Sequence, residues 1–284
     1  MSPTLFAGRF AIACFSLLVM TTSGMADEGF SGDINFKAGL LDLDVQRGLG
    51  DGFSNGQVYG LGVRSMKEFD NFGLQADLNL ERVRGTSRYA YTSYSGALHM
   101  FGTFSGLSLG GMLSFGNDEG WEERAIGGSP YTTTAIEAAY AFGALRFDIQ
   151  LGRFEPDDKT TYIQRGRYGH LGIEWQFDPY WSVKFIADRG AMKFVNPYYL
   201  GSPYDYMKIS GYGGEVKFNV SEDYILFGQY KKTRQTDDYA DEIWHTRSVI
   251  VGLRMPFGSS SRKPVFEDRN PLTGVAPYRF NDWL

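Results

Sequence analysis

The sequence predicts an all-β chain folded as a transmembrane, antiparallel, up-and-down β-barrel of about 12 strands. Three observations predict this fold class. Segments of alternating apolar and polar residues recur along the chain, and short and long connections alternate between them. The segments are 8–12 residues long, whereas soluble strands average about 5–6 residues and a tilted strand crosses a bilayer with about 9–11.

The N-terminal segment 1–26 has the pattern of a secretory signal peptide. Arg9 precedes the apolar run FAIACFSLLVM (10–20), and Ala26 is the small residue after which we expect cleavage. The run is too short for a membrane-spanning helix. Cys14 lies inside it, so we expect a mature chain without cysteine and without a disulfide.

Each predicted strand places apolar side chains on one face and polar ones on the other. In ALRFDIQLGRFE, Phe147 and Ile149 lie on the face opposite Arg146 and Asp148. Only the predicted eleventh strand departs from this alternation, because Ile225 and Phe227 fall on its polar face. In chain order the predicted strands span residues 34–41, 57–65, 72–81, 90–100, 106–116, 133–142, 144–155, 169–177, 180–188, 211–219, 223–232 and 248–257.

The connections between these strands differ in length in a regular way. Even-numbered strands are followed by short turns with the sequences EFDN, GTFS, FGA, DP and SE. Odd-numbered strands are followed mostly by long polar loops, including 117–131, 154–167, 195–205 and 233–244. Outer-membrane barrels have short periplasmic turns, long external loops and an even number of strands. Tyrosine and tryptophan also cluster near strand ends, as interfacial girdles do; the members are Tyr89, Tyr91, Tyr94, Tyr180, Trp181, Tyr198, Tyr199, Tyr204 and Tyr206.

Composition and motifs exclude several other classes of function. The chain has 28 Lys and Arg against 33 Asp and Glu, a net charge of −5, which argues against nucleic acid as a partner. It has no phosphate-binding glycine loop and no paired His or Cys at zinc-ligand spacing. Its acidic clusters lack the spacing of a calcium loop. We therefore expect no cofactor and no metal.

The segment SVIVGLRMPF (248–257), with Gly252 and the closing Phe257, resembles the terminal strand of outer-membrane β-barrel proteins of Gram-negative bacteria, of the porin type. The resemblance implies an outer-membrane location with both termini in the periplasm. It implies outer-membrane lipid and the barrel-assembly machinery as partners. The chain departs from the family in continuing beyond this strand. We thus expect a signal peptide (1–26), a barrel (27–257) and a tail (258–284) that forms a periplasmic extension or folds back to occlude the lumen.

The polar face of the strands supplies the residues expected to line the lumen. These are Lys37, Arg64, Asp77, Glu81, Glu137, Arg146, Asp148, His170, Glu174, Lys184, Asp188, Glu215, Lys217, Lys231 and Arg254. Basic and acidic side chains are balanced, so the set predicts no strong preference for anions or cations. The first hypothesis is a narrow porin or channel for small polar solutes. The alternative is a structural, adhesive or envelope-assembly barrel with a closed lumen.

A third hypothesis is a hydrolase at the outer rim, of the lipase, deacylase or protease type. The weak catalytic candidates are His245, Ser248 and Asp238, close together in sequence near the last strand. His170 is expected to face Glu174 within the lumen. No local pattern matches a catalytic motif, and an acidic external loop beside a rim histidine explains the same residues.

Overall fold

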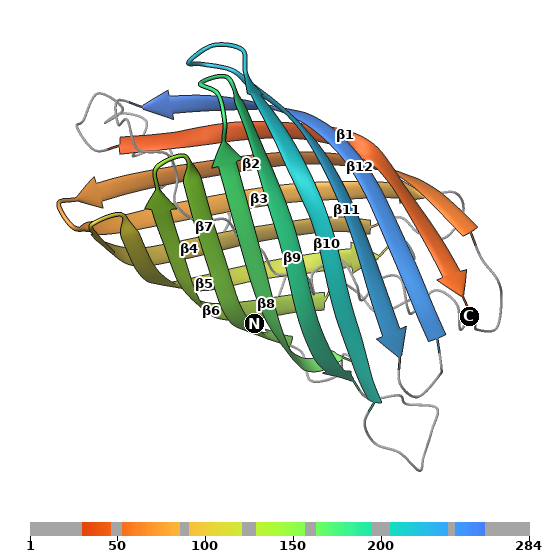
Figure 1. Cartoon of the computed structure of the whole chain (residues 1–284). Helices are drawn as coiled ribbons and strands as arrows, with labels where there is room; N and C mark the ends of the chain where they lie inside the picture. The colour runs from red at the N-terminus through yellow and green to blue at the C-terminus, as the bar shows by residue number, and fades with distance from the viewer. Residues whose placement is uncertain are drawn as a thin grey trace.

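The computed structural model describes residues 30–46, 53–85, 91–120, 129–156, 163–194, 205–237 and 242–258. Within them twelve strands close into one barrel, in which sequence neighbours pair antiparallel and β1 pairs with β12 (Figure 1). The strands are β1 (Phe30–Gln46), β2 (Phe53–Phe69), β3 (Phe72–Gly85), β4 (Tyr91–Phe104), β5 (Leu107–Gly120), β6 (Ser129–Phe142), β7 (Leu145–Pro156), β8 (Ile163–Gln176), β9 (Trp181–Phe194), β10 (Asp205–Asn219), β11 (Ile225–Asp237) and β12 (Glu242–Gly258). The predicted all-β, up-and-down barrel and its strand number are confirmed.

Tight connections join the strands at one end of the barrel, which we call the short-turn end. They fall at residues 70–71, 105–106, 143–144, 177–180 and 220–224. Ser105 and Gly106 have φ angles of 48° and 85°. Positive φ at both central residues is typical of a type I′ turn, whose twist matches that of the flanking strands. β1 begins and β12 ends at this same end, because the strand number is even.

At the opposite end, which we call the far end, several strands are longer than predicted. The sequence predicts a loop at 233–244, yet β11 runs to Asp237 and β12 starts at Glu242. In the added stretch Thr236 lies opposite Ile243, so the hairpin ladder continues and pairs the backbone groups. Polarity alternation does not detect this extension because both faces of a strand can be polar beyond the lipid. The predicted loop boundaries 117–131, 154–167 and 233–244 are therefore wrong.

The outer face of the barrel is apolar. On β7, Phe147, Ile149 and Leu151 are 37%, 42% and 49% exposed, whereas Gln150 on the other face is 3% exposed. Every strand keeps this alternation, so large apolar side chains are exposed around the whole outer wall. A surface of this kind is unfavourable in water and suits contact with lipid tails.

Aromatic side chains gather on the outer face near the short-turn end. The exposed members are Phe69, Phe72, Phe104, Phe142, Trp175, Phe177, Tyr180, Trp181 and Tyr224. Such a girdle flanks the apolar band of outer-membrane barrels. The sequence predicts Tyr180 and Trp181 as girdle residues, but it does not single out the phenylalanines of the short turns. Tyr89, Tyr198, Tyr199 and Tyr204 lie outside the described residues.

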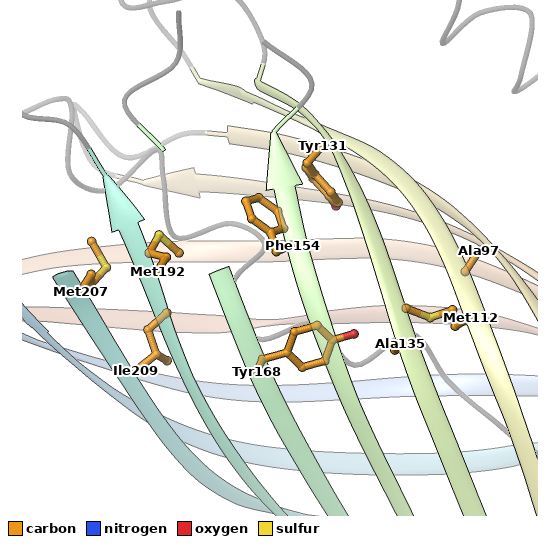
Figure 2. Packing of buried hydrophobic residues seen from close by; sticks show 9 residues of the cluster. All are labelled: Ala97, Met112, Tyr131, Ala135, Phe154, Tyr168, Met192, Met207 and Ile209. Atoms are coloured by element: carbon orange, nitrogen blue, oxygen red, sulfur yellow. The ribbon is translucent and has the colours of Figure 1, made fainter. Parts of the chain in front are cut away.

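The inner face changes character along the barrel axis. Near the far end it carries a buried apolar cluster on β4 to β10, and Figure 2 shows its members: Ala97, Met112, Tyr131, Ala135, Phe154, Tyr168, Met192, Met207 and Ile209. On β7 to β10 the inner positions become charged toward the short-turn end, whereas Met66, Phe101 and Ala139 form a second buried apolar cluster near that end on β2, β4 and β6. On β9 the order from the far end is Met192, Asp188 and Lys184.

The predicted signal peptide (1–26) and nearly all of the predicted tail (258–284) lie outside the described residues, and their boundaries stay predictions. Gly258, the first residue of that tail, still belongs to β12. Across the described ranges, no helix is long and apolar enough to cross a membrane.

Candidate functional site

The candidate site is the charged part of the inner wall. On their strands, the lumen residues predicted from the sequence alternate with the exposed apolar side chains of the outer face. Those that are buried are Arg64, Asp77, Glu137, His170, Lys184, Asp188 and Glu215. Those of intermediate exposure are Lys37, Glu81, Arg146, Asp148, Glu174, Lys217, Lys231 and Arg254. Whether they line an open, solute-filled lumen stays a prediction.

A buried ion pair joins the first two strands near the short-turn end. Arg64 on β2 donates to Asp33 on β1 through Nη2 to Oδ2 at 2.6 Å and Nε to Oδ1 at 3.2 Å. This two-pronged contact is the geometry that a guanidinium offers to a carboxylate. Arg254 on β12 adds its Nε at 3.8 Å from the same Oδ1. Because β1 pairs with both β2 and β12, Asp33 ties together the seam where the barrel closes.

Lysines and carboxylates link β7 to β10 at a similar height. Lys217 Nζ lies 2.8 Å from Glu174 Oε1 and 3.3 Å from Glu215 Oε1. Lys184 Nζ lies 2.7 Å from Asp148 Oδ1. Glu174 and Lys217 stand on strands that flank β9, and Lys184 and Asp148 on strands that flank β8. These contacts therefore span the wall between next-but-one strands, which places the side chains on the inner face.

Two histidines each bridge two carboxylates on this face. His99 Nδ1 on β4 lies 2.9 Å from Glu137 Oε2, and its Nε2 lies 3.3 Å from Asp77 Oδ2. His170 on β8 has the same arrangement with two aspartates, one on each neighbouring strand. Each imidazole therefore joins strands through side chains as well as through the backbone ladder.

The bridge at His170 corrects a prediction made from spacing. His170 and Glu174 share a face of β8, but the carboxylates that contact the imidazole are Asp188 Oδ1 on β9 and Asp148 Oδ2 on β7, at 2.6 Å and 3.1 Å. Glu174 instead accepts hydrogen bonds from Ser182 and Lys217. The register between strands brings Asp188 directly opposite His170. Lys231 on β11 also contacts this aspartate, with its Nζ 2.7 Å from Asp188 Oδ2.

A cavity of about 1160 Å³ opens within the barrel at the short-turn end. Its walls carry basic and acidic side chains together, and its mouth is formed by short turns and by the ends of β1 and β12. The charged and titratable lining residues are Asp33, Arg64, Glu137, Arg146, Asp148, His170, Glu174, Lys184, Lys217, Glu222, Asp223 and Arg254. The cavity offers a polar solute hydrogen-bond donors, acceptors and charges of both signs.

The hydrolase candidates are not brought together by the described structure. His245 and Ser248 are three residues apart on β12 and therefore project to opposite faces of the wall. Asp238 lies outside the described residues. Among the residues that the structure describes, no group of three or more His, Cys, Asp or Glu side chains is placed to hold a metal ion.

Two members of the charged wall are not among the predicted lumen residues. Asp33 falls outside the predicted first strand, which starts one residue later, yet its parity with Lys37 marks it as an inner position. The sequence places His99 near the periplasmic end of the predicted fourth strand. A hydrolase site is expected at the outer rim, so His99 is not among the catalytic candidates. Its partners, Asp77 on β3 and Glu137 on β6, belong to other strands, so only the register of the sheet could identify them.

Searches for relatives by sequence find nothing: no family model and no curated protein matches this chain. Solved structures do match. An outer-membrane channel of the COG4313 group from Pseudomonas putida F1 is similar with a TM-score of 0.59 and 10% identity over 80% of this chain and 95% of that one. The CymD monoaromatic hydrocarbon channel is similar with a TM-score of 0.48 and 8% identity, over 82% of this chain and 89% of that one. The KdgM porin has a TM-score of 0.42 and 10% identity, over 79% and 98%.

These likenesses concern the fold alone, since the sequence identities are 8–10%. Apolar outer wall, aromatic girdle, even strand number and tight turns at one end are the features expected of a barrel that crosses a membrane. The chain therefore has the closed, antiparallel fold of bacterial outer-membrane β-barrel proteins, here with twelve strands.

Proposed function

We propose that the protein is an outer-membrane channel that passes small polar solutes through a narrow, charged lumen. The observation that carries this proposal is the cavity of about 1160 Å³ lined by side chains of both charges. Barrels of about 8 strands are filled by their own side chains, whereas 16–18 strands leave a wide aqueous pore. Twelve strands fit a narrow passage between these limits. The fold shared with a solved outer-membrane channel supports the same conclusion.

The proposed orientation places the short-turn end in the periplasm. Both ends of the barrel wall, at Phe30 and Gly258, lie at that end, so the two termini leave the barrel on the same side. Short turns face the periplasm in barrels of this class. Solutes would enter the lumen at the far end, pass the apolar residues of the inner face there, and leave through the charged cavity at the short-turn end. Outer-membrane lipid surrounds the wall, and the barrel-assembly machinery inserts it.

A barrel with a closed lumen is the second candidate, and a specific observation favours it. The inner wall holds His99 and His170 at 1% and 2% exposure, each between two carboxylates, with a buried apolar cluster toward the far end. Side chains this well packed stabilise a wall without conducting. In that case the protein has a structural, adhesive or envelope-assembly role.

Single-channel recording in planar bilayers separates the two candidates. A conducting barrel gives stable, ohmic current steps. A preparation that shows the heat-modifiable gel shift of a folded barrel yet remains electrically silent would refute the channel and favour the closed lumen. Folding is thus scored independently of conduction.

Reversing one lumen charge tests the proposed path of the solute. Arg146 lines the cavity, so Arg146→Glu is expected to shift the reversal potential in a salt gradient toward cation preference, because fixed charge along a pore selects ions of opposite sign. The matched control is Arg82→Glu, which changes an exposed side chain on the outer face of β3. The control is expected to keep the wild-type reversal potential. Equal effects from the two substitutions would contradict a conduction path past Arg146.

A further inference from the structure

Basic side chains form a band on the outer face of β7 to β12 near the far end. We call this set the basic band: Arg153, Arg165, Arg167, Arg189, Lys193, Lys208, Lys232, Arg234 and Arg247. All occupy outer-face positions, on the same side of the wall as the exposed apolar residues of their strands. Each is exposed or of intermediate exposure. The band is therefore separate from the lumen charges and from the proposed conduction path.

The register brings like charges of the basic band directly opposite one another. Arg153 on β7 pairs with Arg167 on β8, and Arg165 pairs with Lys193 on β9. Lys232 on β11 pairs in the same way with Arg247 on β12. Like charges opposite each other across neighbouring strands destabilise a sheet. Within the described ranges no carboxylate forms an ion pair with Arg153 to relieve its repulsion with Arg167, so a negative partner from outside the wall is expected at this pair.

The described part of the wall offers little negative charge to the basic band. Arg247 lies 3.9 Å from Asp42 on β1, at one edge of the band. Asp44 on β1 and Glu155 on β7 are further carboxylates that the described residues place on the outer face, at the two edges of the band. Within the described ranges, no carboxylate forms an ion pair with Arg153 or Arg189. The middle of the band thus presents a surplus of positive charge to its surroundings.

The basic band adjoins the apolar wall, which determines the kind of partner that can reach it. Leu151 comes two residues before Arg153 on the same face of β7, and it is 49% exposed. On β12, Val249 comes two residues after Arg247 on the same face and is 54% exposed. A group that contacts the band while its tails cover the apolar wall is a lipid headgroup. Guanidinium groups bind phosphate oxygens through paired N–H donors, and basic residues next to a membrane attract anionic lipid.

We propose that the basic band binds the phosphate groups of an anionic lipid headgroup in the membrane leaflet at the far end of the barrel. The proposed ligand is a phosphate-bearing glycolipid or phospholipid held at the wall by its acyl chains, rather than a free anion. Arg153 and Arg167, side by side on adjacent strands, form the centre of one phosphate site. Arg189 and Arg234 flank Ser210 on β10, which lies opposite both in the register, and form a second.

The test measures lipid binding by the full barrel folded in dodecyl maltoside micelles. Native mass spectrometry and the midpoint of the heat-modifiable gel shift are recorded during titration with diphosphorylated lipid A, with lipid A lacking phosphate, and with inorganic phosphate. The variant Arg153→Gln/Arg167→Gln/Arg189→Gln/Arg234→Gln is expected to bind diphosphorylated lipid A at least about tenfold more weakly than wild type, given the attraction of each basic residue near an anionic surface. The control Arg82→Gln/Arg84→Gln removes outer-face arginines from β3, outside the band, and is expected to change binding much less.

Three results would overturn the proposal: equal binding of lipid A with and without phosphate, equal loss in variant and control, or inorganic phosphate alone binding the band as well as the lipid does. If the glutamine variant does not fold, a variant that replaces the same four arginines by lysine is used instead, because it keeps the positive charge. It is expected to bind with intermediate strength, since lysine lacks the paired donors. Because the band lies outside the lumen, channel conductance of the folded variants is expected to equal that of wild type, so this proposal and the proposed channel can fail separately.

Discussion

Replacing Arg64 by methionine is expected to destabilise the barrel by about 3–5 kcal/mol, the cost of removing one partner from a buried ion pair. The side chains of Arg64 and Asp33 are 8% and 4% exposed and meet through two contacts. Removing the guanidinium leaves the Asp33 carboxylate buried, with Arg254 Nε 3.8 Å from its Oδ1. Urea unfolding in lipid vesicles, followed by tryptophan fluorescence, measures the change in free energy of unfolding.

The double variant Asp33→Asn/Arg64→Met serves as the control for this prediction. It removes the carboxylate charge as well, so most of the lost stability is expected to return. An Arg64→Met barrel within about 1 kcal/mol of wild type would contradict the buried pair, because exposed pairs contribute no more than that. A double variant as unstable as the single one would assign the loss to packing instead of charge.

A charge on the outer wall is expected to have the second largest effect. Phe147 lies in the apolar stretch of β7 between the aromatic girdle and Arg153, and it is 37% exposed. Phe147→Arg places a guanidinium against lipid tails and is expected to cost about 2–4 kcal/mol if the position is near the bilayer midplane. The measurement is the yield of folded barrel in vesicles, scored by the heat-modifiable gel shift, together with urea unfolding.

Phe147→Leu is the matched control, since it shortens the side chain and keeps it apolar. We expect this control to insert like wild type. If the arginine variant inserted and unfolded like the leucine variant, the outer face of β7 would not contact lipid. Comparison with Arg146→Glu, one residue away on the inner face, separates the two faces of one strand. That inner substitution is expected to leave insertion intact and to alter ion preference.

The two charge layers of the barrel differ in where their partners lie. Inner charges such as Lys217 and Glu174 have partners within the wall, so they add little net field to the cavity. In the basic band, Arg153 and Arg167 face one another across adjacent strands, and within the described ranges Arg153 has no ion pair with a carboxylate, so an external anion is expected to stabilise them. Neutralising the inner layer should therefore change stability and conduction, whereas neutralising the band should change lipid binding.

The sequence by itself determined the strand number, the face of each strand and the fold class. These follow from local rules: alternation has a period of two residues, and a closed up-and-down barrel pairs each strand with its neighbour. Alternation alone therefore assigns Leu151 and Gln150 to opposite faces of β7. Alternation also places members of the basic band on the outer face, since Arg153 shares the parity of Leu151. That these residues lie at one height along the barrel follows only from the register of the strands.

Only the tertiary structure decided which side chains meet. The contacts of His170 with Asp148 and Asp188, in place of Glu174 four residues away, depend on the stagger between adjacent strands. A shift of the register by two residues keeps every side chain on its face but changes every partner. The alternating pattern is identical for all such shifts, so it carries no information about pairing between strands. Which side chains contact one another is therefore a property of the closed sheet, and which face each occupies is a property of the chain.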